Sequence, residues 1–213
     1  MKLLAHISDD KTRTQTIEEH LTSTAALAGN FAAAFGAQAE AAYTALLHDI
    51  GKYSAGFQQR LQGGPPVDHS TAGAKAAIQD GNIPAALAIA GHHSGIPDLG
   101  NPHDTADEST LVGRSKRRVE DCSQWKQEIS PAKAALPPWL LRQPDNLTMA
   151  FFTRMLYSSL VDADFIDTET FMDGKAAPRG MGEPLPALLE KVRAQAKRYL
   201  DSPAASSVAQ ERN

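Results

Sequence analysis

Residues 45–52, with the sequence ALLHDIGK, join the end of an apolar helical stretch to two adjacent polar side chains, His48 and Asp49. An isolated His-Asp pair carries little information, but this chain has further histidines and acids at separated positions. Nitrogen and oxygen donors from several helices suit a transition-metal centre better than a hydrophobic core. The sequence therefore predicts one site built from His20, His48, Asp49, His69, His92, His93 and either Asp162 or Asp164.

Helical periodicity dominates the chain. In residues 16–35 apolar side chains recur every three or four positions, Thr16 and Glu19 form a capping box, and His20 lies beside the apolar stripe, so we expect it to face inward. Gly51, Ser70 and Asn146 are the expected caps of later helices. Because no stretch alternates with period two, we predict an all-α fold. Further helices are expected at 37–50, around 53–61, and at 69–81, 84–91, 146–163 and 187–200.

Length and composition limit the possible classes of protein. The 213 residues suffice for one substantial core, and 42% are hydrophobic, which is ordinary for a globular domain. No apolar run approaches the roughly 20 residues of a membrane helix, and the N-terminal apolar stretch is too short for a signal peptide. The single cysteine, Cys122, excludes an internal disulfide, so we expect a cytoplasmic protein.

We predict one domain over residues 1–200, with a variable insertion at 97–146 that contains one or two helices. Residues 201–213 are small and polar and are expected to form a linker or a disordered tail. The net charge of −4 argues against tight DNA binding by the chain alone. Two basic clusters are interpreted as solvated helix faces, with contact to DNA left open: Arg114, Lys116, Arg117 and Arg118, and Lys191, Arg193, Lys197 and Arg198.

The predicted ligand set suits hydrolysis of phosphodiesters. Two divalent ions about 3.5–4 Å apart can activate water and offset charge on the phosphoryl oxygens, provided that a carboxylate bridges them. Asp49 has two oxygens and is the natural bridge. Taken singly, each histidine is more often a core or loop residue, but one shared site explains all of them together. His6 and His103 lack such partners and are expected at the surface.

The ordered motifs resemble a known family. His20, the His48-Asp49 pair and a late aspartate form the H…HD…D signature of the HD superfamily of metal-dependent phosphohydrolases. Five segments together resemble the HD nuclease domain of the CRISPR-associated helicase-nuclease of type I systems over nearly the whole chain. They are EEHL at 18–21, HDIGK at 48–52, DHS at 68–70, GHHSGIPD at 91–98 and LVDADFIDTE at 160–169.

This resemblance implies an all-α HD-domain helical bundle, with its metal site between helices, that degrades single-stranded DNA with one or two divalent ions. It also implies a helicase partner and an RNA-guided surveillance complex. By position, His20, His48, Asp49 and Asp164 would hold one ion, and the second would lie among Asp49, His69, His92 and His93. Lys52 would lie near the scissile phosphate as a catalytic charge; the alternative is an ordinary surface lysine.

Two features depart from the family pattern. Asp162 and Asp164 face nearly opposite sides of a helix, so only one can be the ligand; Asp164 is preferred because it precedes the aromatic Phe165. The chain also has no phosphate-binding loop of the Gly-Lys-Ser/Thr type and cannot supply helicase activity. We therefore expect either a separate nuclease subunit or the N-terminal domain of a longer protein.

The mixed imidazole and carboxylate donors favour manganese, iron, cobalt or nickel over magnesium. A metal-dependent DNA nuclease is the leading hypothesis. One alternative is an HD-type phosphohydrolase acting on nucleotides or cyclic nucleotides. The other is a non-catalytic binding module that a metal only stabilises. An open coordination position would distinguish a catalytic metal from a structural one.

Overall fold

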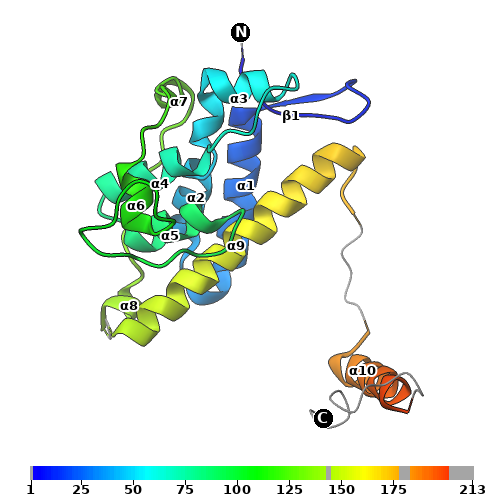
Figure 1. Cartoon of the computed structure of the whole chain (residues 1–213). Helices are drawn as coiled ribbons and strands as arrows, with labels where there is room; N and C mark the ends of the chain where they lie inside the picture. The colour runs from blue at the N-terminus through cyan, green and yellow to red at the C-terminus, as the bar shows by residue number, and fades with distance from the viewer. Residues whose placement is uncertain (1, 143–144, 178–182, 202–213) are drawn as a thin grey trace. The chain divides into compact units, whose positions relative to one another are not determined.

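The computed structural model describes residues 2–142, 145–177 and 183–201 and confirms the predicted all-α class (Figure 1). Contacts divide the chain into two compact units, residues 1–176 and 177–213. The second unit contains helix α10 (Leu185–Leu200), close to the predicted helix at 187–200. The domain spanning 1–200 and the insertion at 97–146 stay predictions, and the predicted tail beyond Asp201 lies outside the described residues. No helix within the described ranges is long and apolar enough to cross a membrane.

The first unit is built on six helices, four of which begin with a side-chain cap. The predicted capping box of Thr16 and Glu19 begins the first helix, and the side chain of Asn82 accepts a hydrogen bond at the start of the fifth. The six are α1 (Ile17–Ala32), α2 (Gln38–Leu47), α3 (Ala55–Arg60), α4 (Ser70–Gln79), α5 (Ile83–Gly91) and α9 (Asn146–Asp173). Two 3-10 helices, η1 (Ala33–Phe35) and η2 (Ile50–Tyr53), extend α1 and follow α2.

Small side chains let these helices pack closely. Helix α1 packs on α2 and α9, while α5 lies in the centre against α2, α4 and α9. Seven of the nine residues of α5 are buried, among them four alanines, as expected for a helix that is covered on all sides. On α4, a Cβ atom at Gly73 would overlap the carbonyl oxygen of Leu47. Helix α4 therefore lies directly against the end of α2, next to the His48-Asp49 pair.

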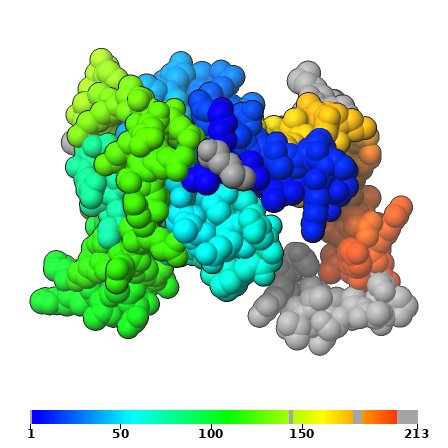
Figure 2. Space-filling model, turned by 90° about the horizontal axis from the view of Figure 1, so that it is seen from above, coloured from blue at the N-terminus to red at the C-terminus, as the bar shows by residue number. Residues whose placement is uncertain are grey.

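The N-terminal residues form a hairpin that the sequence did not predict. Strand β1 (Leu4–Ile7) pairs antiparallel with β2 (Thr14–Thr16). Strands of four and three residues are too short to show a period-two pattern. Arg13 donates hydrogen bonds to the carbonyl oxygens of Phe171 and Met172 at the end of α9, at 2.6 and 2.8 Å. Figure 2 shows the hairpin in dark blue between this end of α9, in gold, and the cyan segment that follows α2.

Three expected caps were wrong. Ser70 is the first residue of α4, and the carboxylate of Asp68 instead accepts a hydrogen bond from the backbone N–H of Thr71 at 3.1 Å. The N-cap of α9 is Asp145, one residue before the expected Asn146. This helix also runs ten residues beyond the predicted end at 163. Gly51 is not a left-handed cap, because it lies inside η2 without a positive φ.

Residues 97–142 carry three short helices, α6 (Leu111–Lys116), α7 (Trp125–Glu128) and α8 (Pro138–Arg142), rather than one or two. Two side chains of the first basic cluster donate hydrogen bonds to backbone carbonyl oxygens within this segment. Lys116 donates to the Pro102 carbonyl oxygen at 2.8 Å, and Arg117 donates to that of Ala106 at 2.9 Å. Arg117 is half-buried and follows the end of α6, so its interpretation as part of a solvated helix face was wrong, while Lys116 is exposed as expected. The second cluster lies on α10, whose cations are exposed, as expected.

One buried acid predicts a pH-dependent stability. Glu40 is 1% exposed and accepts a hydrogen bond from Asn82 at 2.6 Å. Burial raises the pKa of its carboxyl above 4.5, and the bond from Asn82 opposes this only in part. Ionisation of Glu40 therefore costs folding free energy, and this cost develops as the pH rises above 4.5. The free energy of unfolding of Glu40→Gln, relative to the parent, should increase between pH 4 and pH 8 in urea titrations.

The matched control is Glu18→Gln, because Glu18 is partly exposed in its ion pair with Lys2. This variant should gain no stability relative to the parent as the pH rises. A difference between Glu40→Gln and the parent that stays constant over the same pH range would contradict the assignment.

Candidate metal centre

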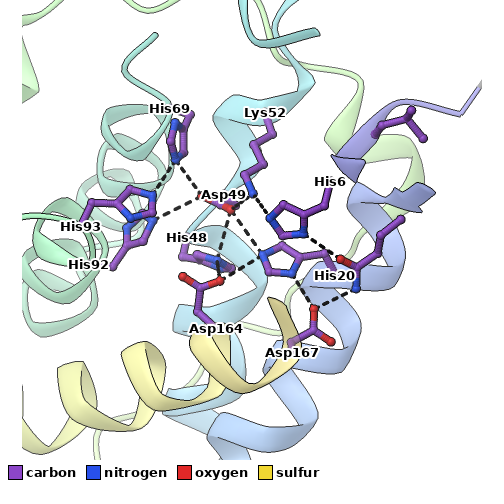
Figure 3. Close-up of polar contacts among 12 residues, drawn as sticks. His6, His20, His48, Asp49, Lys52, His69, His92, His93, Asp164 and Asp167 are labelled. Carbon is purple, nitrogen blue, oxygen red and sulfur yellow. Dashed lines mark hydrogen bonds and ion pairs between the residues drawn. The ribbon is translucent and has the colours of Figure 1, made fainter. Parts of the chain in front are cut away.

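Side chains from five parts of the first unit converge on one point (Figure 3). Helix α1 supplies His20, the end of α2 supplies His48 and Asp49, and α9 supplies Asp164. The other three histidines come from the start of α4 and the end of α5: His69, His92 and His93. The structure thus brings together every predicted ligand except Asp162, which is exposed on α9. Asp49 lies at the centre of the set.

The first group of donors contains His20, His48, Asp49 and Asp164. Nε2 of His20 lies 3.3 Å from Oδ2 of Asp49 and 3.4 Å from Oδ1 of Asp164. Nε2 of His48 lies 3.4 and 3.7 Å from the same two oxygens. Both histidines and Asp49 are almost fully buried, and the side chain of Asp164 is 18% exposed.

The second group contains Asp49, His69, His92 and His93. The other oxygen of Asp49, Oδ1, lies 3.4 Å from Nε2 of His69 and 3.4 Å from Nε2 of His92. The Nε2 atoms of His69 and His93 face each other at 2.8 Å. His92 is buried, His69 is partly exposed and His93 is exposed, so this group opens toward solvent. Each oxygen of Asp49 therefore faces a different group.

Hydrogen bonds at Nδ1 orient four of the imidazole rings. His48 donates to the carbonyl oxygen of Ala45 at 2.7 Å, and His92 donates to that of Ile89, three residues earlier, also at 2.7 Å. His69 bonds the Val67 carbonyl and His20 bonds the Asp167 carboxylate in the same way. These oxygens only accept hydrogen bonds, so Nδ1 carries the proton in each ring. In the neutral form of each ring, the Nε2 lone pair is then directed at the cluster, which is the tautomer that metal ligands need.

The donor set fits divalent metal ions. Five buried atoms of the cluster make no hydrogen bond within the described part of the chain: Nε2 of His20, His48 and His92, and both oxygens of Asp49. Buried polar atoms without partners are costly, so five of them at one point indicate a site that binds a cation. Donors bound about 2.1 Å from one ion lie about 3.0–3.4 Å apart, and most of the separations above are close to this range.

Comparison with known protein families independently identifies an HD domain in this chain. The HD domain matches residues 17–124, about half of the chain. The chain belongs to the HD domain family. No curated protein matches it. An HD domain with this cluster is a metal-dependent phosphohydrolase. We call the two groups of donors together the HD centre. The matched range covers six of its seven predicted ligands, all except Asp164 on α9.

The charges of the HD centre favour a cation in the first group. Burial alone would lower the pKa of His48, but Asp49 and Asp164 outweigh it and raise this pKa to about 10. Burial would raise the pKa of Asp49, but Lys52, His48 and His20 hold it well below its usual range. Without a metal, the acids therefore stay ionised and His48 carries an additional proton, which an incoming cation displaces.

The second group behaves differently. Burial lowers the pKa of His69 despite the opposing charge of Asp49, and burial together with His92 lowers the pKa of His93 to about 4. These two rings are therefore neutral near pH 7. Neutral imidazole is the form that coordinates metal. Because Nδ1 of His69 donates to Val67, the contact between the two Nε2 atoms needs the His93 proton on Nε2, and this proton has to move to Nδ1 before His93 binds a metal ion through Nε2.

Gly51 places His69 in the HD centre. A Cβ atom at Gly51 would overlap the backbone of His69, including its carbonyl oxygen. The glycine is thus required for the close approach of η2 to the start of α4, rather than for a left-handed turn. This contact sets the distance between Asp49 on one segment and His69 on the other.

Lys52 is buried, at 5% exposure, so the alternative of an ordinary surface lysine was wrong. Its ammonium lies 2.7 Å from Oδ2 of Asp49 and 2.9 Å from Nε2 of His6. His6 was expected at the surface and is instead packed against the HD centre, with its ring 4.6 Å from that of His20. His103 is exposed, as expected.

Sequence reasoning missed His6, Gln15 and Asp167 as neighbours of the HD centre. Gln15 and Asp167 bond each other at 2.8 Å, and Asp167 also bonds His20. Asp167 had a detectable signal, because it lies three residues after Asp164 and therefore on the same face of α9. His6 and Gln15 had none, since their positions depend on the unpredicted hairpin.

Metal content should separate the two groups of the HD centre. We expect His93→Ala to lose metal from the second group only, Asp164→Ala from the first group only, and Asp49→Ala from both. Elemental analysis of protein loaded with manganese and then desalted measures this directly. His103→Ala is the matched control and should bind as much as the parent. Equal loss in the His93, Asp164 and Asp49 variants would contradict a division into two groups.

Substitution of Gly51 should damage the HD centre through the backbone. We expect Gly51→Ala to lower the free energy of unfolding by about 1–3 kcal/mol, typical of overpacking, and to weaken manganese binding. Urea unfolding and calorimetric titration measure the two effects. The control is Gly56→Ala, whose Cβ would meet only the flexible side chain of Glu120. Unchanged metal binding in Gly51→Ala would show that His69 tolerates the displacement.

Proposed function

We propose that this HD phosphohydrolase is a nuclease that hydrolyses single-stranded DNA in CRISPR interference, in the cytoplasm. Membership of the HD family supports the phosphohydrolase chemistry. The ordered motifs at 18–21, 48–52, 68–70, 91–98 and 160–169 support the nuclease branch, because their combination is far more specific than the His-Asp pair alone.

The observation that carries the proposal is the position of Asp49. Its two oxygens face two separate groups of histidines, at 3.3–3.4 Å from the nearest nitrogens. His20, His48, Asp49 and Asp164 would hold one divalent ion, and Asp49, His69, His92 and His93 the other. Bound there, such ions activate water and offset negative charge on the phosphoryl oxygens. The fixed rings around Asp49 keep the donors in place during the reaction.

Lys52 supplies a further positive charge beside this carboxylate. Its ammonium is buried and lies 2.7 Å from Asp49, so it is held at a defined point rather than moving in solvent. A phosphate that approaches Asp49 would meet this charge. Positive charge placed in advance stabilises the additional negative charge that develops on the phosphoryl group in the transition state.

Access to the centre supports a polymeric substrate. The second group is open, since His93 is exposed and the side chain of His69 is 15% exposed. A strand can therefore bring a phosphodiester to the metal ligands without being enclosed. Enzymes that act on mononucleotides instead need walls that surround a small molecule. The exposed edge thus favours DNA over a nucleotide.

A helicase domain or subunit and an RNA-guided surveillance complex are the proposed partners, on the basis of the family resemblance. The chain has no phosphate-binding loop and a net charge of −4, so strand separation and much of the DNA affinity would have to come from such partners. Mixed nitrogen and oxygen donors favour manganese, iron, cobalt or nickel as the metal.

The test is cleavage of a single-stranded DNA oligonucleotide in the presence of manganese. We expect cleavage that EDTA abolishes and that falls at least about 100-fold in His48→Ala and Asp49→Ala, because direct ligands should matter at least as much as the partners behind them. The control variant His103→Ala should cleave like the parent.

Two outcomes would contradict the nuclease proposal. Hydrolysis of nucleotides or cyclic nucleotides with no cleavage of DNA would assign the chain to another HD activity. Fully metal-loaded protein that hydrolyses no phosphodiester, yet unfolds when the metal is removed, would indicate a structural metal in a binding module.

A further inference from the structure

A continuous chain of hydrogen bonds runs from Lys52 to His20 through the N-terminal hairpin (Figure 3). The Lys52 ammonium lies 2.9 Å from Nε2 of His6, and Nδ1 of His6 lies 2.8 Å from Oε1 of Gln15. Nε2 of Gln15 lies 2.8 Å from Oδ2 of Asp167, and this oxygen lies 2.7 Å from Nδ1 of His20. Two of the five members, His6 and Gln15, belong to the hairpin.

The direction of every bond in this chain is determined. The Asp167 carboxylate only accepts, so it receives hydrogen bonds from the Gln15 amide nitrogen and from Nδ1 of His20. The amide oxygen of Gln15 then faces Nδ1 of His6, which must donate. Nε2 of His6 is left as an acceptor, and the Lys52 ammonium is the donor that it faces. No donor opposes a donor anywhere along the chain.

The hydrogen-bond chain starts and ends beside Asp49, and we call its five members together with Asp49 the ring; the contact between His20 and Asp49 that completes it is not a hydrogen bond. Lys52 also lies 2.7 Å from Oδ2 of Asp49, and this oxygen lies 3.3 Å from Nε2 of His20. Both ends of the hydrogen-bond chain therefore meet at Asp49. Displacement of the hairpin would open the ring at His6 and Gln15 and remove support from Lys52 and Asp167 together.

The hairpin is anchored firmly enough to hold this ring. Gln58 on α3 accepts a hydrogen bond from the Leu4 backbone N–H at 3.1 Å and donates one to the Leu4 carbonyl oxygen at 2.9 Å. The same amide group donates to the Lys52 carbonyl oxygen at 2.9 Å. Just before β2, Arg13 donates hydrogen bonds to the end of α9. The hairpin is thus tied to both elements that carry its partners, η2 and α9.

We propose that the β1–β2 hairpin positions side chains of the HD centre, with His6 and Gln15 as the positioning residues. His6 holds the Lys52 ammonium beside Asp49, and Gln15 holds Asp167 on His20. The proposal rests on the proposed function in one respect only, namely the action of Lys52 on a substrate phosphate. The hairpin lies outside the matched HD segment at 17–124.

The ring also leaves Lys52 one free donor. An ammonium has three N–H groups, and within the described residues Lys52 directs one at His6 and another at Asp49. The third is available for an oxygen of the substrate phosphate. A flexible lysine side chain loses entropy when it is fixed in one position, so a pre-formed acceptor such as His6 lowers the cost of holding the charge ready.

The first test measures the ring without measuring activity. In metal-free protein labelled with ¹⁵N-histidine, His6 should carry its proton on Nδ1, and this assignment should be lost in Gln15→Leu. Calorimetry should show that Gln15→Leu weakens manganese binding about 10-fold, the usual effect of a lost partner behind a ligand. Thr14→Val is the matched control, because Thr14 is the exposed neighbour of Gln15 on β2. It should leave both measurements within about twofold of the parent.

The second test is a double-mutant cycle on DNA cleavage with manganese. We expect His6→Phe to lower kcat about 10-fold with little change in KM, and to have less than a twofold effect when Lys52→Met is already present. His6→Gln, which restores an acceptor for Lys52, should recover part of the loss. Thermal unfolding of each variant identifies any that fail to fold.

Several results would overturn the inference. A proton on Nε2 of His6 in the parent would reverse the direction of the ring. Manganese affinity in Gln15→Leu equal to that of the parent would separate the hairpin from the HD centre. An equal loss of kcat from His6→Phe with and without Lys52 would show that His6 does not act through Lys52. These results differ from a failure of the proposed function. If the parent protein had no nuclease activity, the His6 tautomer and the manganese affinity of Gln15→Leu would still test the role of the hairpin.

Discussion

A single buried carboxylate, Asp49, holds the centre together. It is 1% exposed and has an imidazole nitrogen within 3.4 Å on either side and an ammonium at 2.7 Å. A buried charge is tolerated only when opposite charges or hydrogen-bond donors surround it. Five separate segments of the chain must therefore converge on this point. The need to surround the Asp49 carboxylate with donors therefore governs both the packing of the helices and the positions of the predicted metal ligands.

Close backbone contacts meet this constraint. Gly73 lets α4 touch the end of α2, and Gly51 lets η2 touch His69. The alanine-rich surfaces of α4 and α5 let these helices lie deep in the core. Larger side chains at these points would push the histidines away from Asp49. Small residues in this protein therefore set the distances between the predicted ligands.

The sequence predicted much of this arrangement because the signals were local. Helix periodicity and the capping box located α1 and the inward position of His20. Six of the predicted ligands lie around the seventh, Asp49, although their role in binding metal stays a prediction. The hairpin could not be predicted, because its short strands are held by distant contacts such as Arg13 with the end of α9. His6 and Gln15 were missed for the same reason. Gly51 was misinterpreted because a close approach between backbones leaves no local pattern.

The ring through His6 and Gln15 joins three parts of the chain that are far apart in sequence. The hairpin precedes the matched HD segment, and α9, with Asp164 and Asp167, follows it. A fragment trimmed to residues 17–124 would retain the His-Asp pair but would lack Asp164 of the first group and three residues of the ring, His6, Gln15 and Asp167. The recognisable segment is therefore smaller than the smallest piece able to assemble the complete centre, and its borders are a poor guide for dissecting the protein.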